Sequence, residues 1–193
     1  MTKPLWTPTA DAVATSQMMA FIDFVNQQYD QKIISYEQLH QWSIKNLEFC
    51  WQSIWAFCNV IASRKTNTIL RNADNMEKAT WFEDAKLNFA ENLLQHRSDK
   101  TALISVSENN QKRKLTYDEL YQQVSALAHF LKENNIKPGD RIAAFMPNTQ
   151  ETIIAMLATT AVGAVWSSCS PDFGLQGLLD RFEQIKPKIL FAI

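Results

Sequence analysis

The residues best placed for binding chemistry form a short polar loop from Ser168 to Gly174, with the sequence Ser-Cys-Ser-Pro-Asp-Phe-Gly. Its hydroxyls and carboxylate are joined by a proline and a glycine that would fix a turn, and a predicted helix follows whose first amide hydrogens could meet an anion. In open parallel sheets, ligands bind beyond the carboxyl ends of strands, and both this loop and residues 146–149 follow predicted strands. From the residues alone, a connecting loop in which Ser170 or Asp172 caps the next helix is the simpler explanation.

Motifs that carry catalysis in other proteins are missing from this sequence. Its four glycines form neither a dinucleotide fingerprint nor a phosphate loop, and no Gly-x-Ser-x-Gly occurs. Cys50, Cys58 and Cys169 are odd in number and show no metal-ligand spacing, which predicts reduced, structural thiols in a cytoplasmic protein. We therefore assign no catalytic and no metal-ligating residue.

Composition and charge exclude several classes of partner. The 193 residues are 46% hydrophobic and 20% charged, which is typical of a globular protein with a core. A net charge of -1 without a basic stripe argues against nucleic acid and against an anionic membrane as partners. The longest nearly apolar run, residues 153–166, is shorter than the about 20 residues that span a bilayer.

The first part of the chain, residues 1–98, is predicted to be a helical cap segment. Apolar residues recur at helical spacing over residues 16–62, and residues 63–80 read as a polar connector. Three short helices could not bury the apolar surface of four tryptophans in this part: Trp42, Trp51, Trp55 and Trp81. We expect them to pack partly against residues beyond 100 and partly against chain beyond residue 193.

Residues 99–193 are predicted to begin an α/β domain. Apolar strands over 101–107, 141–146, 164–168 and 188–193 alternate with helices after Thr116, over 149–161 and over 175–185, and residues 113–115 can pair back on the first strand. This order predicts a parallel sheet with three crossovers. The inward positions predict one core made of Leu120, Val124, Leu127, Ile142, Phe145, Ile154 and Leu157.

The predicted sheet is incomplete, because its last strand has no following helix to cover it. We therefore expect a chain that ends inside a domain. The surface exposed in this way is expected to lead to self-association.

Three stretches carry a family resemblance: WFEDAKLNFAENLL (81–94), LTYDELYQQVSALAHFLKENNIKPGDRIAAFMPN (115–148) and GAVWSSCSPDFG (163–174). They resemble the N-terminal part of the acetoacetyl-CoA synthetases, a branch of the AMP-forming, acyl-adenylate-forming acyl-CoA ligase superfamily. The middle stretch is similar to the whole superfamily. The other two are specific to the acetoacetate branch and separate it from the acetate and propionate branch.

This resemblance implies an acid–thiol ligase of lipid metabolism. The full-length enzyme would use ATP with Mg²⁺ to form an acyl-adenylate from acetoacetate, and would then transfer the acyl group to coenzyme A (CoA). The family's phosphate loop, magnesium motif, adenosine-binding aspartate and C-terminal lysine match no position here, so we expect residues 1–193 alone to be inactive. By analogy, the candidate residues on the CoA side are Ser168, Asp172, Phe173 and Gly174.

Two alternatives remain open at this point. The chain could belong to another short-chain acyl-CoA synthetase, of the acetyl or propionyl type. It could also be a non-catalytic α/β interaction module that docks a partner through its aromatic helical segment. A reading frame that continues past Ile193 into a Ser/Thr/Gly-rich loop would favour a ligase.

Overall fold

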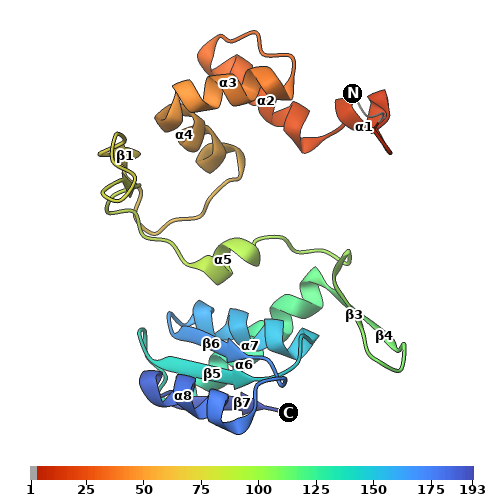
Figure 1. Cartoon of the computed structure of the whole chain (residues 1–193), viewed down its shortest axis with the longest axis vertical. Coiled ribbons are helices and arrows are strands. Elements are labelled where there is room, and N and C mark those ends of the chain that lie inside the picture. The colour runs from red at the N-terminus through yellow and green to blue at the C-terminus, as the bar shows by residue number, and fades with distance from the viewer. Residues whose placement is uncertain (1–3) are drawn as a thin grey trace. The chain divides into compact units, whose positions relative to one another are not determined.

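The structure, a computed structural model, describes residues 4–193. The chain forms two compact units, which divide between Lys86 and Leu87 (Figure 1). The division into domains between residues 98 and 99 stays a prediction. No helix within the described residues is both long enough and apolar enough to cross a membrane.

Over residues 4–86, the first unit contains four helices and one small ladder of strands. Its elements are α1 (Ala10–Ala14), α2 (Gln17–Tyr29), α3 (Tyr36–Lys45), α4 (Leu47–Phe57), β1 (Leu70–Arg71) and β2 (Thr80–Trp81). The side chains of Ser16 and Ser35 cap α2 and α3. The Gln38 side chain accepts a hydrogen bond from the Ile34 amide rather than from that of Ser35, so Ser35 and Gln38 do not form a reciprocal capping box.

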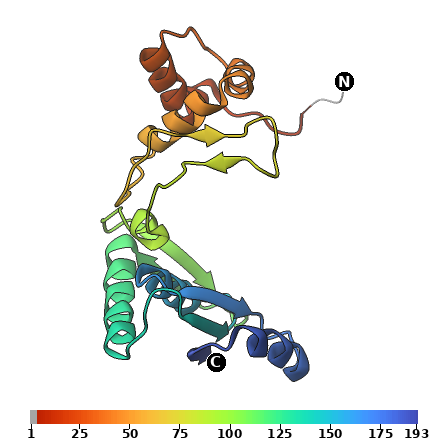
Figure 2. The same cartoon turned by 90° about the vertical axis from the view of Figure 1, so that its left-hand side faces the viewer.

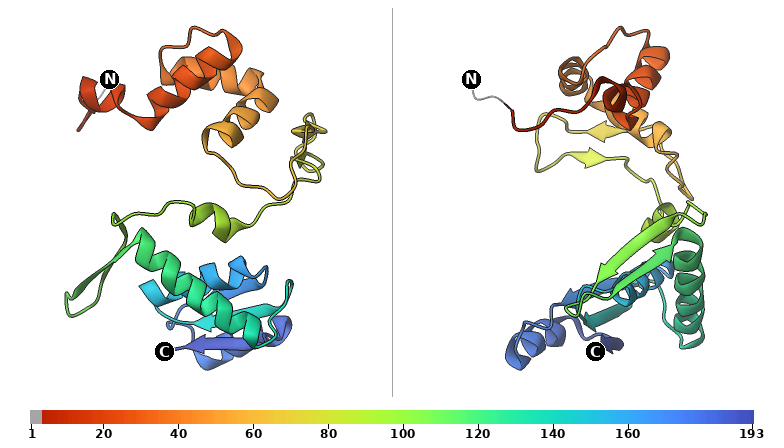
Figure 3. Two further views of the ribbon diagram at one scale, coloured as in Figure 1. Left: turned by 180° about the vertical axis from the view of Figure 1, so that it is seen from behind. Right: turned by 90° about the vertical axis from the view of Figure 1, so that its right-hand side faces the viewer.

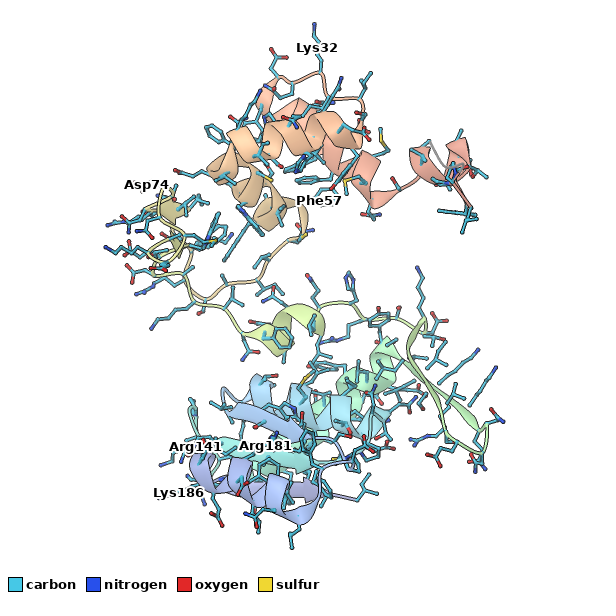
Figure 4. The ribbon with its side chains drawn as sticks, viewed as in Figure 1. Lys32, Phe57, Asp74, Arg141, Arg181 and Lys186 are labelled. Atoms are coloured by element: carbon cyan, nitrogen blue, oxygen red, sulfur yellow. The ribbon has the colours of Figure 1, made fainter. Side chains whose placement is uncertain are left out.

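Aromatic side chains hold the helices of this unit together. Beside a core of Ile22, Val25, Ile33 and Leu39, the Tyr29 ring lies 5.6 Å from that of Trp42 and 5.2 Å from that of Phe49. Phe57 projects from the end of α4 (Figure 4) and meets Phe21 edge-on at 5.2 Å. Ring pairs of this kind add about 0.5–1.5 kcal/mol to the free energy of area burial.

The polar connector is more ordered than the sequence predicted. β1 and β2 pair antiparallel (Figure 2), and Arg64 forms an isolated bridge with Lys86. Trp51, which is 42% exposed, lies 5.4 Å from Trp81, and the ring of Trp55 lies 4.6 Å from that of Phe82. Trp51 and Trp55 therefore pack on the two residues that directly follow the connector, while the packing of the tryptophans beyond residue 100 stays a prediction.

The second unit confirms the predicted α/β class with a parallel sheet. Its elements are α5 (Phe89–Leu93), β3 (Thr101–Val106), β4 (Lys112–Thr116), α6 (Tyr117–Glu133), β5 (Arg141–Phe145), α7 (Gln150–Ala161), β6 (Val165–Cys169), α8 (Leu175–Ile185) and β7 (Ile189–Ala192). The parallel sheet has the order β6-β5-β7. Alternation of strands and helices predicted this arrangement because a parallel strand can be reached only by a crossover.

The two faces of the parallel sheet bury different side chains. Ile142 and Trp166 face a core that contains residues of α6 and α7, whereas Ala143 and Cys169 pack with Phe182 of α8. Figure 2 shows α6 on one side of the strands and α8 on the other. The predicted placement of Phe145 in the α6–α7 core is wrong, because successive side chains of a strand point to opposite faces and Phe145 packs on the α8 side.

The prediction of three parallel crossovers is wrong for the first strand. β3 pairs antiparallel with β4 in a separate hairpin, which projects from the parallel strands in Figure 3, so the sheet has only the crossovers through α7 and α8. The turn is closed by the Asn110 amide, which donates to the Ser107 carbonyl at 2.8 Å. β3 also keeps exposed residues such as Ile104, whereas a central parallel strand is buried on both faces.

Helix ends follow the sequence closely. A capping box begins α6, with reciprocal hydrogen bonds between Thr116 and Glu119. The hydrogen bond from the Thr116 amide is the main cause that lowers the pKa of Glu119. After the end of α7, Gly163 has a φ of 77°, the left-handed conformation that glycine commonly adopts just past a helix.

Candidate functional site

The carboxyl ends of the three parallel strands lie at one edge of the sheet. Phe145 of β5 is in register with Cys169 of β6 and with Ala192 of β7. The two loops singled out in the sequence, residues 146–149 and 170–174, therefore leave the same edge. This is the position where open α/β sheets bind ligands.

Internal hydrogen bonds shape the 170–174 loop. The Ser170 hydroxyl donates to Asp172 Oδ2 at 2.7 Å and accepts from the Asp172 amide at 3.3 Å. The Phe173 amide donates to the Ser170 carbonyl at 3.1 Å. Neither Ser170 nor Asp172 caps α8, whose N-cap is Gly174 without a side-chain hydrogen bond. The simpler capping role considered for these two residues is therefore wrong.

The candidate residues of this loop are all accessible. Ser168 is exposed at the end of the edge strand β6, Asp172 and Gly174 are exposed, and Phe173 is 41% exposed. Gly174 has a φ of -63° and no atom within 4 Å of an added Cβ, so neither backbone strain nor crowding requires a glycine there. The structure thus places an acid, an aromatic ring and open backbone side by side, with a hydroxyl at the strand end.

Sequence reasoning missed Arg181, which contacts this loop from α8. Its guanidinium carbon lies 4.2 Å from the centre of the Phe173 ring, and its Nη1 donates to the Gly177 carbonyl at 2.7 Å. Arg181 is labelled on α8 in Figure 4. The signal in the sequence was the spacing of four, which places Gly177 and Arg181 on one face of α8 and Phe173 one turn before them.

The second loop borders a hollow of about 370 Å³ between β3 and the start of α7. Beside it, buried Gln150 donates to the Arg113 carbonyl at 3.2 Å, and Arg113 Nη2 donates to Glu151 Oε1 at 2.7 Å. The hydrogen bond from Arg113 is the main cause that lowers the pKa of Glu151. These contacts attach the hairpin to α7, so these charged groups have a structural explanation.

The donor groups needed for a metal do not come together in the part of the chain that the structure describes. Over residues 4–193, no three or more side chains of His, Cys, Asp or Glu lie close enough to hold a metal ion. All three cysteines are free; Cys50 and Cys169 are buried and Cys58 is exposed. Burial raises the pKa of the Cys50 thiol.

Comparison with known families covers most of the chain. Residues 89–192 match the AMP-binding enzyme family, and residues 36–93 match the family of the acetyl-coenzyme A synthetase N-terminus. These two families meet near the division between the compact units of the structure.

Individual relatives match along nearly the whole chain. An acetoacetyl-coenzyme A synthetase of Rhizobium meliloti is 44% identical over 98% of this chain and 29% of its own length. A malonamoyl-CoA synthetase of Penicillium aethiopicum is 37% identical over 97% of this chain and 27% of its own length. The solved acetoacetyl-CoA synthetase of Streptomyces lividans superposes with a TM-score of 0.88 at 36% identity, over 99% of this chain and 30% of that one. The chain thus spans less than a third of the length of these relatives.

Proposed function

This chain belongs to the AMP-binding enzyme family, and we propose that it forms the N-terminal part of an acid–thiol ligase that makes acetoacetyl-CoA. The observation that carries the proposal is the superposition of both compact units, over 99% of the chain, on an acetoacetyl-CoA synthetase. An isolated α/β module would not be expected to share the helical unit and the connector as well. The non-catalytic alternative is therefore the weaker hypothesis.

The proposed reaction has two steps. A carboxylate oxygen of the acid attacks the α-phosphorus of ATP, which forms an acyl-adenylate and releases diphosphate. The sulfur of CoA then attacks the acyl carbon, so that a C–S bond forms, the C–O bond to AMP breaks, and the thiol proton passes to solvent. Such chemistry depends on positioning and on charge stabilisation.

We propose that this chain has a scaffold role in that reaction. We propose that the Mg²⁺ that accompanies ATP is held by residues outside this chain, because the magnesium motif of the family that the sequence resembles matches no position here. ATP and the acid would likewise be activated by residues that this chain does not contain. The chain's own contribution is the carboxyl edge of the sheet and its loops.

We propose that the 170–174 loop, with Ser168, lies beside the pantetheine arm of CoA. The exposed Phe173 ring offers an apolar face to its methylene and methyl groups, and the hydroxyl of Ser168 can hydrogen-bond its amides. Open space around Gly174 leaves the backbone accessible to an extended chain. Asp172, whose carboxylate accepts from Ser170, would hold the turn rather than take part in the chemistry.

The acid is proposed to be short and to carry a carbonyl at its third carbon. Acetoacetyl and malonamoyl groups, which the names of two relatives contain, both have this carbonyl. An acetyl- or propionyl-specific ligase is the second candidate, because residues 36–93 match the acetyl-coenzyme A synthetase N-terminus. A cytoplasmic role in lipid metabolism is part of the proposal, and the free thiols suit a reducing compartment.

ATP–diphosphate exchange tests the first step. The protein to assay is a chimera in which this chain replaces the matching N-terminal segment of the Rhizobium meliloti synthetase, with the 193-residue chain alone as the control. We expect exchange that depends on acetoacetate, weaker exchange with acetate or propionate, and none from the chain alone. Exchange by the chain alone would place the active site within residues 1–193 and overturn the scaffold role.

A further inference from the structure

Phe173, which precedes α8, and two residues of that helix form a clamp on the candidate loop. Phe173, Gly177 and Arg181 follow one another at intervals of four, and the guanidinium of Arg181 covers the Phe173 ring at 4.2 Å. Arginine prefers this position because its charge is attracted to the negative face of the ring. The clamp therefore joins the residue before the N-cap to the middle of the helix.

Gly177 leaves the space that the clamp occupies. A Cβ at this position would lie 3.4 Å from Arg181 Nη1 and 3.5 Å from Phe173 Cδ1. A methyl group there would be in ordinary van der Waals contact with both partners. The Gly177 carbonyl also accepts the 2.7 Å hydrogen bond from Arg181 Nη1, which fixes the guanidinium over the ring.

The clamp supplies a restraint that the loop otherwise lacks. The described contacts within the loop all involve Ser170, and α8 has no side-chain cap that would fix the approach to Gly174. Holding the Phe173 ring against α8 sets the direction of the chain at residues 172–174. One face of the ring stays accessible, since the side chain remains 41% exposed.

We propose that Arg181 is a positioning residue that holds Phe173, and with it the 170–174 loop, ready for CoA during thioester formation. This inference rests on the proposed function for its role in catalysis, but the clamp itself does not. Arg181 acts through Phe173 and is not proposed to touch the reacting atoms. Adenylation, which precedes the arrival of CoA, should be independent of the clamp.

The clamp can be tested by NMR on the 193-residue chain. In the unaltered protein we expect nuclear Overhauser contacts between Arg181 side-chain protons and the Phe173 ring, and ordered amides at residues 172–174. Arg181→Gln or Phe173→Leu should lower the order parameters of these amides below about 0.6, and the double variant should add little to either. Arg181→Lys should restore part of the order, since it keeps the charge.

A matched control uses the same type of contact elsewhere in this unit. Arg97 lies 3.2 Å from the centre of the Tyr121 ring, so Arg97→Gln removes a cation–π contact without touching the loop. We expect unchanged order at residues 172–174 in this variant. Unchanged order in Arg181→Gln as well, or absence of the Overhauser contacts, would overturn the proposal.

Kinetics of the chimera separate positioning from general structure. Loss of an exposed cation–π contact changes an equilibrium constant about two- to fivefold, so Arg181→Gln should raise the KM for CoA by that factor. The rate of acetoacetate-dependent ATP–diphosphate exchange should stay unchanged. An equal loss in both half-reactions would mean a merely structural role and overturn the proposal. A chimera without ligase activity would refute the proposed function, whereas the NMR result would still decide whether the clamp exists.

Discussion

Ile142 offers a quantitative test of the fold, because it lies in the central strand of the parallel sheet and is 0% exposed. Ile142→Ala removes three buried carbon atoms, each worth about 0.8 kcal/mol of transfer free energy. The cavity left behind raises the expected loss of unfolding free energy to about 3 kcal/mol. With a urea m-value of about 2 kcal/mol/M, the unfolding midpoint of this unit should fall by about 1.5 M.

Hydrogen–deuterium exchange at increasing urea concentration measures this shift within one unit. Peptides from β5 and α7 should show the fall, while peptides from α2 in the other compact unit serve as an internal reference. Ile104→Ala is the matched control, since Ile104 is 64% exposed on β3, and its midpoint should fall by less than about 0.5 M. Equal shifts for the two variants would refute the placement of Ile142 in the core.

Three further predictions concern local features and are measured by thermal unfolding followed by circular dichroism. Gly163→Ala forces alanine to a φ of 77° and should lower the free energy of unfolding by about 1–2 kcal/mol, whereas Gly174→Ala, at a φ of -63°, should change it by less than about 0.5 kcal/mol. Equal losses for the two variants would contradict these backbone conformations. Thr116→Ala should cost about 1 kcal/mol through the lost N-cap of α6, and an unchanged Tm would show that the cap is not formed in solution. The hydrogen bond from the Lys188 side chain is the main cause that lowers the pKa of Asp140 below its ordinary value of 3.8. The ionised carboxylate therefore stabilises the fold above pH 3.8. This contribution is lost as the pH falls through the lower pKa of the folded state. Asp140→Asn should therefore lower the Tm at neutral pH and have progressively less effect below pH 3.8, while a pH-independent difference would argue against the ion pair.

Local signals explain why much of the fold could be predicted from the sequence. The start of α6 was predictable because Thr116 and Glu119 satisfy each other's backbone amides within one turn. The bounds of α8, Leu175–Ile185, followed in the same way from apolar spacing between a glycine and a proline-containing turn. Such features depend on neighbours in the sequence, which are visible without a structure.

Pairing between distant segments could not be predicted in the same way. The pairing of residues 113–115 back on β3 was predicted, but β3 was also assigned to the parallel sheet, which it does not join. Whether a strand joins a sheet depends on turn geometry and on which face is buried. Phe145 was assigned to the wrong side of β5 because apolar residues occupy both faces of that strand. The candidate loop was identified from its position after a strand, whereas Arg181 was missed because its contact with Phe173 depends on side-chain direction.

The most direct test of the account is the product that the chimera forms from acetoacetate, ATP and CoA. Mass spectrometry of the CoA thioesters should detect acetoacetyl-CoA together with an equal amount of AMP, and little product when acetate or propionate replaces acetoacetate. The Rhizobium meliloti synthetase is the positive control. A chimera that is monodisperse and has the circular dichroism of a folded protein, yet forms no thioester while the control does, would contradict the claim that this chain is part of an acetoacetate–CoA ligase.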